Sequence, residues 1–239
     1  VEKCQFCRSW RLKELGAGIE KVAELLKENF PQLKISQLDS DRIKTRERAE
    51  LIVKKFTLSP TGLLLGTEMA LYYLKGKVEN GIVIGGDSML ALPDFRIREK
   101  VFRLFSRLRI LSSKHFLIQT RQNDSPFLNQ IITGDLIDFY RGEIRDRREL
   151  HYPPFRLLLK LTVTGKEATV NDWLERLSRE LAEYQPVTYP ALPPRVGQND
   201  RSHLLLRLAP ASWPEPRLVE KLKHLPPEIV VTVDPETLT

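Results

Sequence analysis

Gly62-Leu63-Leu64-Leu65-Gly66 and Gly81-Ile82-Val83-Ile84-Gly85 are two short apolar runs, each bounded by glycine. Continuous apolar runs of this length are typical of strands buried on both faces, as in parallel sheets. Two further strands are predicted at residues 34–39 and 115–120, and apolar residues recur at helical spacing over 19–30, 49–56 and 94–111. Because strands alternate with helices, the sequence predicts an open, mostly parallel α/β sheet with ligand sites beyond the strand C-termini.

A second, smaller unit is predicted to begin near His151-Tyr152-Pro153-Pro154-Phe155, since the paired prolines exclude a helix and favour extended chain. Before it, residues 127–150 show a helical pattern with a break at Gly134. After it, the pattern predicts strands at 155–164, 203–208 and 229–234 and helices at 170–181 and 216–225. If part of the Pro-rich stretch 185–199 is also a strand, the order is β-α-β-β-α-β, a split βαβ, ferredoxin-like α+β module.

Composition limits the classes of protein to which the chain can belong. Of its 239 residues 41% are hydrophobic, and no apolar run approaches the ~20 residues that span a bilayer. The N-terminus carries no signal-peptide pattern, so we expect a soluble, cytoplasmic protein without a membrane partner. The chain begins at Val1 rather than Met, and we therefore expect a fragment or a processed form.

Positive charge is concentrated in the first part of the chain. Residues 1–148 hold 27 Lys/Arg and 19 Asp/Glu, whereas residues 149–239 hold 11 and 12. This asymmetry predicts a polyanion partner for the first part and a packing or docking role for the second. We expect no strong contact with phosphates from residues 149–239.

Cys4 and Cys7 have the spacing of one knuckle of a zinc ribbon. A structural zinc site of this kind needs four ligands, and the sequence has no other cysteine. Zinc binding is therefore expected only if further ligands lie outside this chain. The alternative is a pair of thiols that binds no metal.

Several short blocks follow one another in a fixed order. They are Gly16-Ala17-Gly18-Ile19-Glu20, Leu38-Asp39-Ser40-Asp41, Gly66-Thr67-Glu68-Met69, Pro93-Asp94-Phe95-Arg96 with Glu99, Ile118-Gln119-Thr120, Tyr152-Pro153-Pro154-Phe155, Pro190-Ala191 and Val233-Asp234-Pro235. In this order, after a Cys-x-x-Cys pair, they resemble the primosomal protein N′ family, the PriA-type replication restart helicases. The resemblance implies a remnant zinc knuckle at 1–10, a RecA-like helicase lobe two at 11–148 and a PriA-like C-terminal α+β domain at 149–239.

Compared with the same family, this sequence differs in a motif that an active helicase needs. The family's Gln-x-x-Gly-Arg-x-Gly-Arg run, whose arginines clamp the γ-phosphate of ATP, falls on residues 107–114. Leu111 replaces the first of these arginines and Lys114 the second, and lysine lacks the planar fork of arginine. Loss of an arginine finger costs about 10³-fold or more in rate. The turn glycines are also missing, and we expect a shortened loop before His115.

Two further blocks are altered. Tyr72-Tyr73 stands where the family has Lys-Gly, and Gly85-Gly86-Asp87 stands where it has Asp-Ala-Asp. The sequence also holds no Gly-x-x-x-x-Gly-Lys-[Ser/Thr] phosphate loop. We therefore expect no catalytic residue and no ATP hydrolysis in this chain.

DNA binding is predicted for a basic stripe at helical spacing: Arg96, Lys100, Arg103 and Arg107. A row of cations along a rigid helix can follow phosphates, and each contact adds to a salt-dependent affinity. The alternative is an ordinary amphipathic helix with a solvated charged face.

The function that these features favour is DNA binding in replication restart and primosome assembly, without ATPase or helicase activity. The partners would be forked or single-stranded DNA and other replication restart proteins. One alternative is that the chain forms the C-terminal half of an active ATP-dependent 3′–5′ DNA helicase. A second alternative is a protein-interaction scaffold that does not bind DNA.

Overall fold

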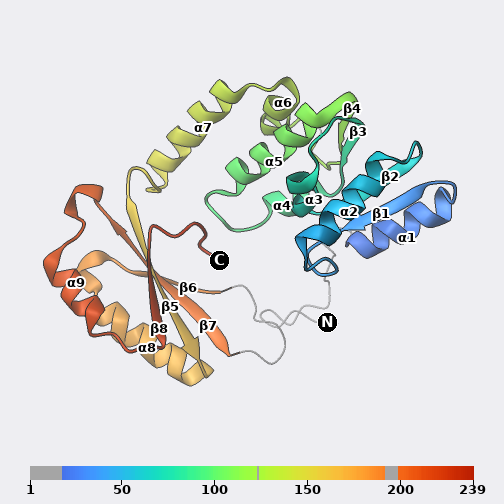
Figure 1. Cartoon of the computed structure of the whole chain (residues 1–239). Helices are drawn as coiled ribbons and strands as arrows, with labels where there is room; N and C mark the ends of the chain where they lie inside the picture. The colour runs from blue at the N-terminus through green and yellow to red at the C-terminus, as the bar shows by residue number, and fades with distance from the viewer. Residues whose placement is uncertain (1–17, 123, 192–198) are drawn as a thin grey trace. The chain divides into compact units, whose positions relative to one another are not determined.

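The computed structural model describes residues 18–122, 124–191 and 199–239, and they form two compact units (Figure 1). The first unit contains residues 18–92 and 97–135, and the second contains 93–96 and 136–239. Pro93–Arg96 thus groups with the second unit, although the residues on either side of it belong to the first. The domain boundaries predicted at residues 10/11 and 148/149 stay predictions.

The first unit is built from helices and short parallel strands. In chain order its elements are α1 (Ile19–Asn29), β1 (Lys34–Leu38), α2 (Arg46–Thr57), β2 (Gly62–Gly66), α3 (Glu68–Tyr73), β3 (Val78–Val83), α4 (Gly86–Leu90), α5 (Ile97–Leu111), β4 (Ser112–Ile118) and α6 (Pro126–Thr133). The strands pair in parallel as β1 with β2 and β3 with β4. In the described residues the two pairs are separate two-stranded sheets. The alternation of strands and helices is confirmed, whereas a single open sheet and a RecA-like lobe are not.

Helix α5 packs closely on the β3–β4 pair, and small residues permit that approach. Val101, Phe102 and Phe105 on α5 are buried. A Cβ added to Gly81 of β3 would lie 3.0 Å from the Leu108 side chain of α5 and 2.2 Å from Ser112 Oγ. Glycine at this position therefore allows the helix and the strand to touch.

The second unit contains the split βαβ module that the sequence predicts. Its elements are α7 (Leu136–Glu149), β5 (Leu157–Gly165), α8 (Glu167–Glu180), η1 (Ala182–Tyr184), β6 (Val187–Pro190), β7 (Asp200–Leu208), η2 (Pro210–Ser212), α9 (Pro216–Lys223) and β8 (Ile229–Val233). The strands form one sheet in the order β6-β7-β5-β8, and every neighbouring pair is antiparallel. The Pro-rich stretch does supply the extra strand, β6, so the β-α-β-β-α-β order is confirmed.

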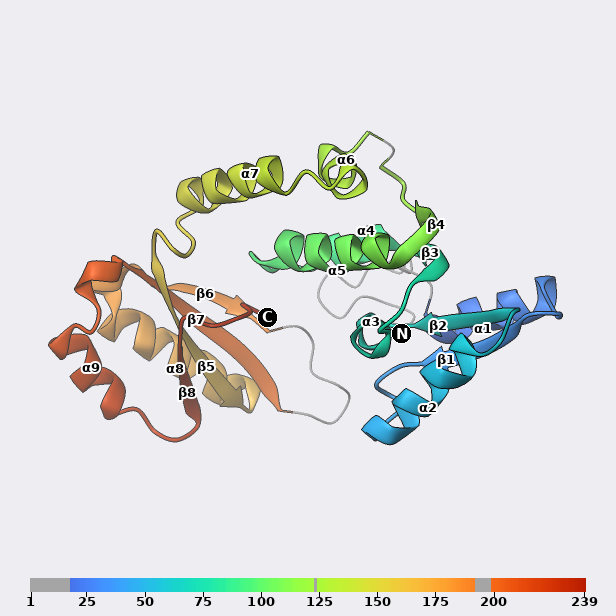
Figure 2. The same cartoon turned by 45° about the horizontal axis from the view of Figure 1, so that its top comes forward.

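The two faces of this sheet have different coverings. Alternate residues of β5, such as Leu159 and Leu161, pack in one core with Val170 and Leu177 of α8 and with Leu218 of α9. Both helices therefore cover the same face (Figure 2). We call the other side the open face. It buries Leu158, Leu205 and Leu238, with three aromatic side chains packed against them: Phe95, Tyr152 and Tyr189.

The break predicted within the helical stretch 127–150 is present at Gly134, which follows α6 with φ 79°. A left-handed residue at a helix C-terminus favours glycine because it has no Cβ. A Cβ added here would also lie 2.6 Å from Arg109 Nη2 of α5. The positive φ therefore requires glycine, and a larger residue would in addition displace the flexible end of Arg109.

We predict that Gly134→Ala lowers the free energy of unfolding by about 1 kcal/mol or more, because alanine is strained at this φ and meets Arg109. The control is Gly142→Ala within α7, where an added Cβ meets nothing within 4 Å. Alanine there should be neutral or raise stability by up to about 1 kcal/mol. Chemical denaturation measures the free energy of unfolding of both variants. Equal stabilities of Gly134→Ala and Gly142→Ala would contradict the requirement for glycine at position 134.

Candidate nucleic-acid interface

The segment where a helicase lobe would place its arginine clamp is regular structure in this chain. Helix α5 continues to Leu111 and β4 begins at Ser112, so no loop separates them. Leu111 is partly buried. Lys114 lies in β4, where its Nζ is 2.9 Å from Glu79 Oε1 in an exposed ion pair. Leu111 and Lys114, which stand where the family has arginines, therefore carry no guanidinium.

The two arginines of this segment, Arg107 and Arg109, both lie against other parts of their own unit. Arg107 Nε donates to the carbonyl oxygen of Leu71 at 3.1 Å. Arg109 lies against Gly134, at the C-terminal end of α6. Cations are favoured near unpaired carbonyls at a helix C-terminus. Both arginines thus have structural contacts in the first unit.

The structure divides the predicted basic stripe between the two units. Lys100, Arg103 and Arg107 lie on α5 in the first unit, and Arg96 precedes the helix and belongs to the second. Lys100 Nζ lies 3.8 Å from Glu68 Oε2, and both side chains are about half exposed. Arg103 is exposed. The three residues on α5 are therefore close enough to act together, and Arg96 has a different environment.

The C-terminal ends of β3 and β4 are joined by hydrogen bonds. The Asp87 carboxylate accepts from the Thr120 hydroxyl at 2.7 Å and from the backbone N–H of Arg121 at 2.8 Å. These two bonds lower the pKa of Asp87 below its usual value. Gln119 Oε1 also accepts from the N–H of Gly85 at 3.2 Å. An α/β sheet binds its ligand beyond the C-terminal ends of its strands. In this chain the segments that follow β3 and β4 are instead hydrogen-bonded to one another.

In the second unit, arginine side chains surround a pair of stacked aromatic rings. Phe95 and Tyr152 stack with centroids 5.0 Å apart and an angle of 18° between their planes. Arg96 lies 5.1 Å from the Phe95 centroid and Arg147 5.7 Å from it, and Arg207 lies 5.9 Å from that of Tyr152. We call these five residues the arginine–aromatic cluster. Cation–π contacts of this kind stabilise by about 0.5–1 kcal/mol at exposed sites.

The sequence contained only an indirect signal for this cluster. Phe95 and Tyr152 belong to two blocks of the resemblance, Pro93-Asp94-Phe95-Arg96 and Tyr152-Pro153-Pro154-Phe155. Nothing in their spacing predicts that the two blocks pack together. Arg207 lies in a strand whose helix-facing neighbours are leucines, and no motif includes it.

Beside this cluster the open face buries two basic side chains. Lys160 Nζ donates to the carbonyl oxygens of Thr237 at 2.9 Å and Thr239 at 3.5 Å, and burial lowers its pKa. His203 is 2% exposed, and its Nδ1 lies 3.0 Å from Thr162 Oγ1. Burial lowers the pKa of His203 to about 4, with Lys160 and Arg201 adding to the effect. His203 is therefore neutral at physiological pH.

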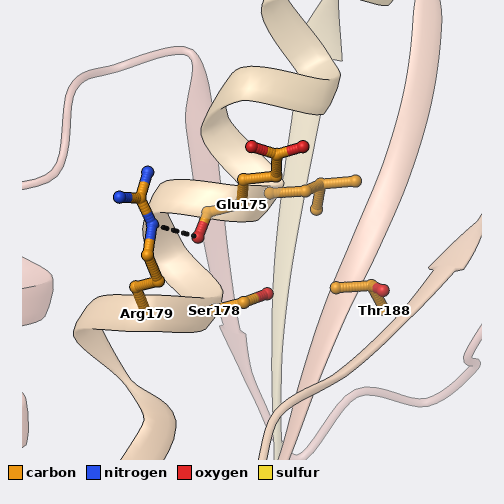
Figure 3. Close-up of a pocket in the computed structure, with 5 residues that line it drawn as sticks. Glu175, Ser178, Arg179 and Thr188 are labelled. Carbon is orange, nitrogen blue, oxygen red and sulfur yellow. Dashed lines mark hydrogen bonds between the residues drawn. The ribbon is translucent and has the colours of Figure 1, made fainter.

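A shallow hollow of about 350 Å³ lies between α8 and β6 (Figure 3). It is lined by Leu174, Glu175, Ser178, Arg179 and Thr188. Arg179 Nε donates to the carbonyl oxygen of Glu175 within α8, at 3.4 Å. Because α8 forms one wall, the hollow belongs to the helix-covered side and is separate from the arginine–aromatic cluster.

The metal prediction concerns Cys4 and Cys7, which lie outside the described residues. Within the described residues, no group of three or more His, Cys, Asp and Glu side chains is placed to hold a metal ion. Over the same residues, no helix is both long and apolar enough to cross a membrane.

Comparisons with known proteins agree with the motif blocks. The family model of the primosomal protein N C-terminal domain matches residues 148–236. The replication restart protein PriA of Chlamydia muridarum is 32% identical over 176 residues, which is 70% of this chain and 23% of that protein. Its counterparts in Synechocystis and Thermotoga maritima are 27% and 26% identical over 97% and 100% of this chain, and the matches cover 30% and 33% of those proteins.

Over most of its length the chain is related to the replication restart proteins PriA, so the resemblance shown by its motifs is confirmed. The chain spans only 23%, 30% and 33% of the length of the three PriA proteins described above.

We predict that the stability of the second unit falls as the pH drops from about 6.5 to about 4. Over this interval the unfolded chain binds a proton at His203, whose ordinary pKa is about 6.5, and the folded chain does not. Stability must therefore decrease toward acid pH. Denaturant midpoints measured across this range check the effect.

His203→Gln should reduce the dependence of the second unit's stability on pH between about 4 and 6.5. The control is His224→Gln, since the side chain of His224 is 75% exposed. The control should keep the slope of the parent chain. A slope unchanged in His203→Gln would contradict the assignment.

Proposed function

We propose that the chain binds forked or single-stranded DNA in a PriA-like replication restart system and does not hydrolyse ATP. The proposal rests on the relationship to PriA proteins together with one structural observation, the direct passage from α5 to β4. Its partners would be DNA and other replication restart proteins, in the cytoplasm.

The absence of ATP hydrolysis is argued from the chemistry of phosphoryl transfer. Charge develops on the phosphoryl oxygens, and a clamp must present planar guanidinium donors to them. At the corresponding positions this chain has a partly buried Leu111 and a Lys114 paired with Glu79. Arg107 contacts a backbone carbonyl, and Arg109 lies against Gly134. These contacts support the proposal that no arginine of this segment replaces the clamp.

DNA binding is argued from the cations of α5. Lys100, Arg103 and Arg107 are spaced at i, i+3 and i+7, which places them along one side of the helix. The Lys100–Glu68 pair is half exposed, and exposed pairs of this kind contribute only about 0–1 kcal/mol. A DNA phosphate can therefore replace Glu68 as the partner of Lys100 at little cost.

We predict that the chain binds forked DNA with an affinity that falls steeply with salt, and that Lys100→Gln/Arg103→Gln weakens binding. Removal of two phosphate contacts should reduce the slope of log K against log salt by about 1.8 on duplex DNA. Fluorescence anisotropy at several salt concentrations measures both quantities. The matched control is Arg176→Gln/Lys223→Gln, which removes two cations from α8 and α9. No binding by the parent chain, or equal effects of the two double variants, would contradict the proposal.

We also predict that ATP turnover stays at the background rate when forked DNA is added. The assay uses this chain and, in parallel, the longest natural product that contains it. The reason is the missing guanidinium at Leu111 and Lys114. A DNA-stimulated rate well above background in the longer product would favour the alternative, an active 3′–5′ helicase of which this chain is the C-terminal part.

A further inference from the structure

The four-stranded sheet of the second unit has two outer strands, β6 and β8, and their free edges differ. Each is hydrogen-bonded to one neighbouring strand only, β6 to β7 and β8 to β5. A free edge offers N–H and C=O groups to any other extended chain, and proteins protect such edges with proline, lysine or a bulge. The short strand β6 ends in Pro190. Strand β8 contains neither proline nor a charged residue, so its edge is unprotected.

The composition of β8 also favours pairing. Its sequence is Ile-Val-Val-Thr-Val, and every residue in it is β-branched. Such residues are enriched in strands, and an uncharged edge of this kind is a site at which another chain pairs. The nearest prolines, Pro227 and Pro235, both lie outside the strand. The strand can therefore accept a neighbour along its length.

One hydrogen bond fixes which backbone groups of β8 bond to β5. The N–H of Asp234, the first residue after β8, donates to the carbonyl oxygen of Leu158 at 2.8 Å. In an antiparallel pair, residues that exchange hydrogen bonds recur at every second position. Thr232 and Val230 therefore also direct their N–H and C=O groups toward β5.

The remaining backbone groups of β8 point away from the sheet. By the same alternation, these are the N–H and C=O groups of Ile229, Val231 and Val233. The N–H of Ile229 is already used, because it donates to the carbonyl oxygen of Pro226 at 3.0 Å. Within the described residues, β8 bonds to no strand except β5, and no turn or loop bond uses the N–H of Val231 or Val233. The outer edge thus offers two donors to a further strand.

The same edge exposes apolar side chains on both faces of the sheet. Val230 is 58% exposed and Val233 is 43% exposed. Because side chains alternate along a strand, these two valines lie on opposite faces. Val233 pairs with Leu159, which belongs to the helix-covered core, so Val230 lies on the open face. A strand beside β8 would cover apolar surface on each side, and apolar residues in its middle fit this surface.

Acidic residues stand at both ends of β8. Glu228 precedes the strand, Asp234 follows it, and both are exposed. Neither forms an ion pair within the described part of the chain, and the nearby Lys223 lies 3.9 Å from Glu220 instead. Six residues of extended chain separate the two acids, which corresponds to about 20 Å. A complementary strand therefore carries one cation near each end of an uncharged stretch.

The acidic ends disfavour a second copy of this chain as the occupant. In antiparallel pairing about Val231, Glu228 would lie opposite the second copy's Asp234 at both ends of the strand pair. In parallel pairing in register, each acid would lie opposite its own equivalent. Like charges directly opposite one another destabilise a strand pair. A basic strand from another protein avoids this repulsion.

We propose that the outer edge of β8 binds an extended, basic segment of a second protein as an additional strand. The segment has β-branched or other apolar residues in its middle and Lys or Arg at each end. In this mode of recognition, main-chain hydrogen bonds supply affinity and alternate side chains supply specificity. The inference goes beyond the proposed function, because it requires neither DNA nor the absence of ATP hydrolysis.

The test is titration of the isotope-labelled chain with the end-blocked peptide Lys-Val-Thr-Val-Thr-Val-Lys, up to millimolar concentration, followed by NMR of the backbone amides. At saturation the amide hydrogens of Val231 and Val233 should exchange with solvent about tenfold more slowly, because a new strand protects them. Those of Val230 and Thr232, which already bond to β5, should change much less.

Two control peptides separate strand pairing from charge attraction. Lys-Val-Thr-Pro-Thr-Val-Lys has the same charge, but its proline removes a donor and should prevent pairing. Glu-Val-Thr-Val-Thr-Val-Glu should bind more weakly than the basic peptide, because its acids approach Glu228 and Asp234. The net charge of the chain is +7, so non-specific attraction would give the opposite order.

Variants of the chain test the acidic ends directly. Glu228→Gln/Asp234→Asn should weaken binding of the basic peptide about fivefold, the effect of two exposed ion pairs. The matched control is Asp172→Asn/Glu175→Gln, which removes two acids from α8 and should leave the affinity as in the parent chain. Thermal midpoints of both variants show whether each one is folded.

The remaining outcomes overturn the inference. They are unchanged exchange at Val231 and Val233 with millimolar basic peptide, equal binding of all three peptides, and equal affinities of the two double variants. Sedimentation velocity of the chain without peptide provides a further check. A dimer in which the same two amides are protected would assign the edge to a second copy, and protection in the longest natural product alone would assign it to that product. All samples lack DNA, so none of these results depends on DNA binding at α5.

Discussion

The stacking of Phe95 on Tyr152 is the contact on which the open face of the C-terminal sheet depends. A sheet with one face covered by helices still needs a cover for apolar residues on the other face. Here Leu158 and Leu205 are buried beneath Phe95, Tyr152, Tyr189 and Leu238. An aromatic pair of this geometry contributes about 0.5–1.5 kcal/mol beyond its burial. Without Phe95, part of this apolar surface would be exposed to water.

This contact gives the Pro-Asp-Phe-Arg block a structural role. Phe95 covers the open face, Asp94 accepts from Thr237 near the C-terminus, and Arg96 lies over the Phe95 ring. The block therefore supplies a covering layer and a cation to the same face. The altered segment from Arg107 to Lys114, in contrast, is a helix end followed by a strand. One block of the motor resemblance thus makes tertiary contacts, while the segment that would carry the arginine clamp is regular structure.

Local pattern predicted most of the secondary structure. Helical spacing located α1, α2 and α5, because this pattern comes from the burial of one face of a helix. An apolar run located β5, which is buried on both faces from Leu158 to Leu161. The β-α-β-β-α-β order was predicted on the condition that the Pro-rich stretch supplies a strand, and β6 meets that condition. The separation of the first unit's strands into two pairs was not predicted, because a run of apolar residues does not specify which strand lies beside it.

The site could be predicted only in part. Lys100, Arg103 and Arg107 follow from helical spacing, and they do lie on α5. Arg96 was assigned to the same stripe, but the helix begins one residue after it and its side chain lies over Phe95. The contact between Phe95 and Tyr152 joins residues far apart in the chain, and such pairs leave no periodic signal. The role of Arg207 depends on that contact and could not be found without the fold.

The most direct test of DNA binding by α5 is photocross-linking of a 4-thiothymidine oligonucleotide to the chain, followed by mass spectrometry of the linked peptides. We expect cross-links in peptides of α5 that contain Lys100, Arg103 or Arg107. Excess unlabelled oligo(dT) should remove them. Cross-links confined to α8 and α9, or none above background, would contradict DNA binding at α5.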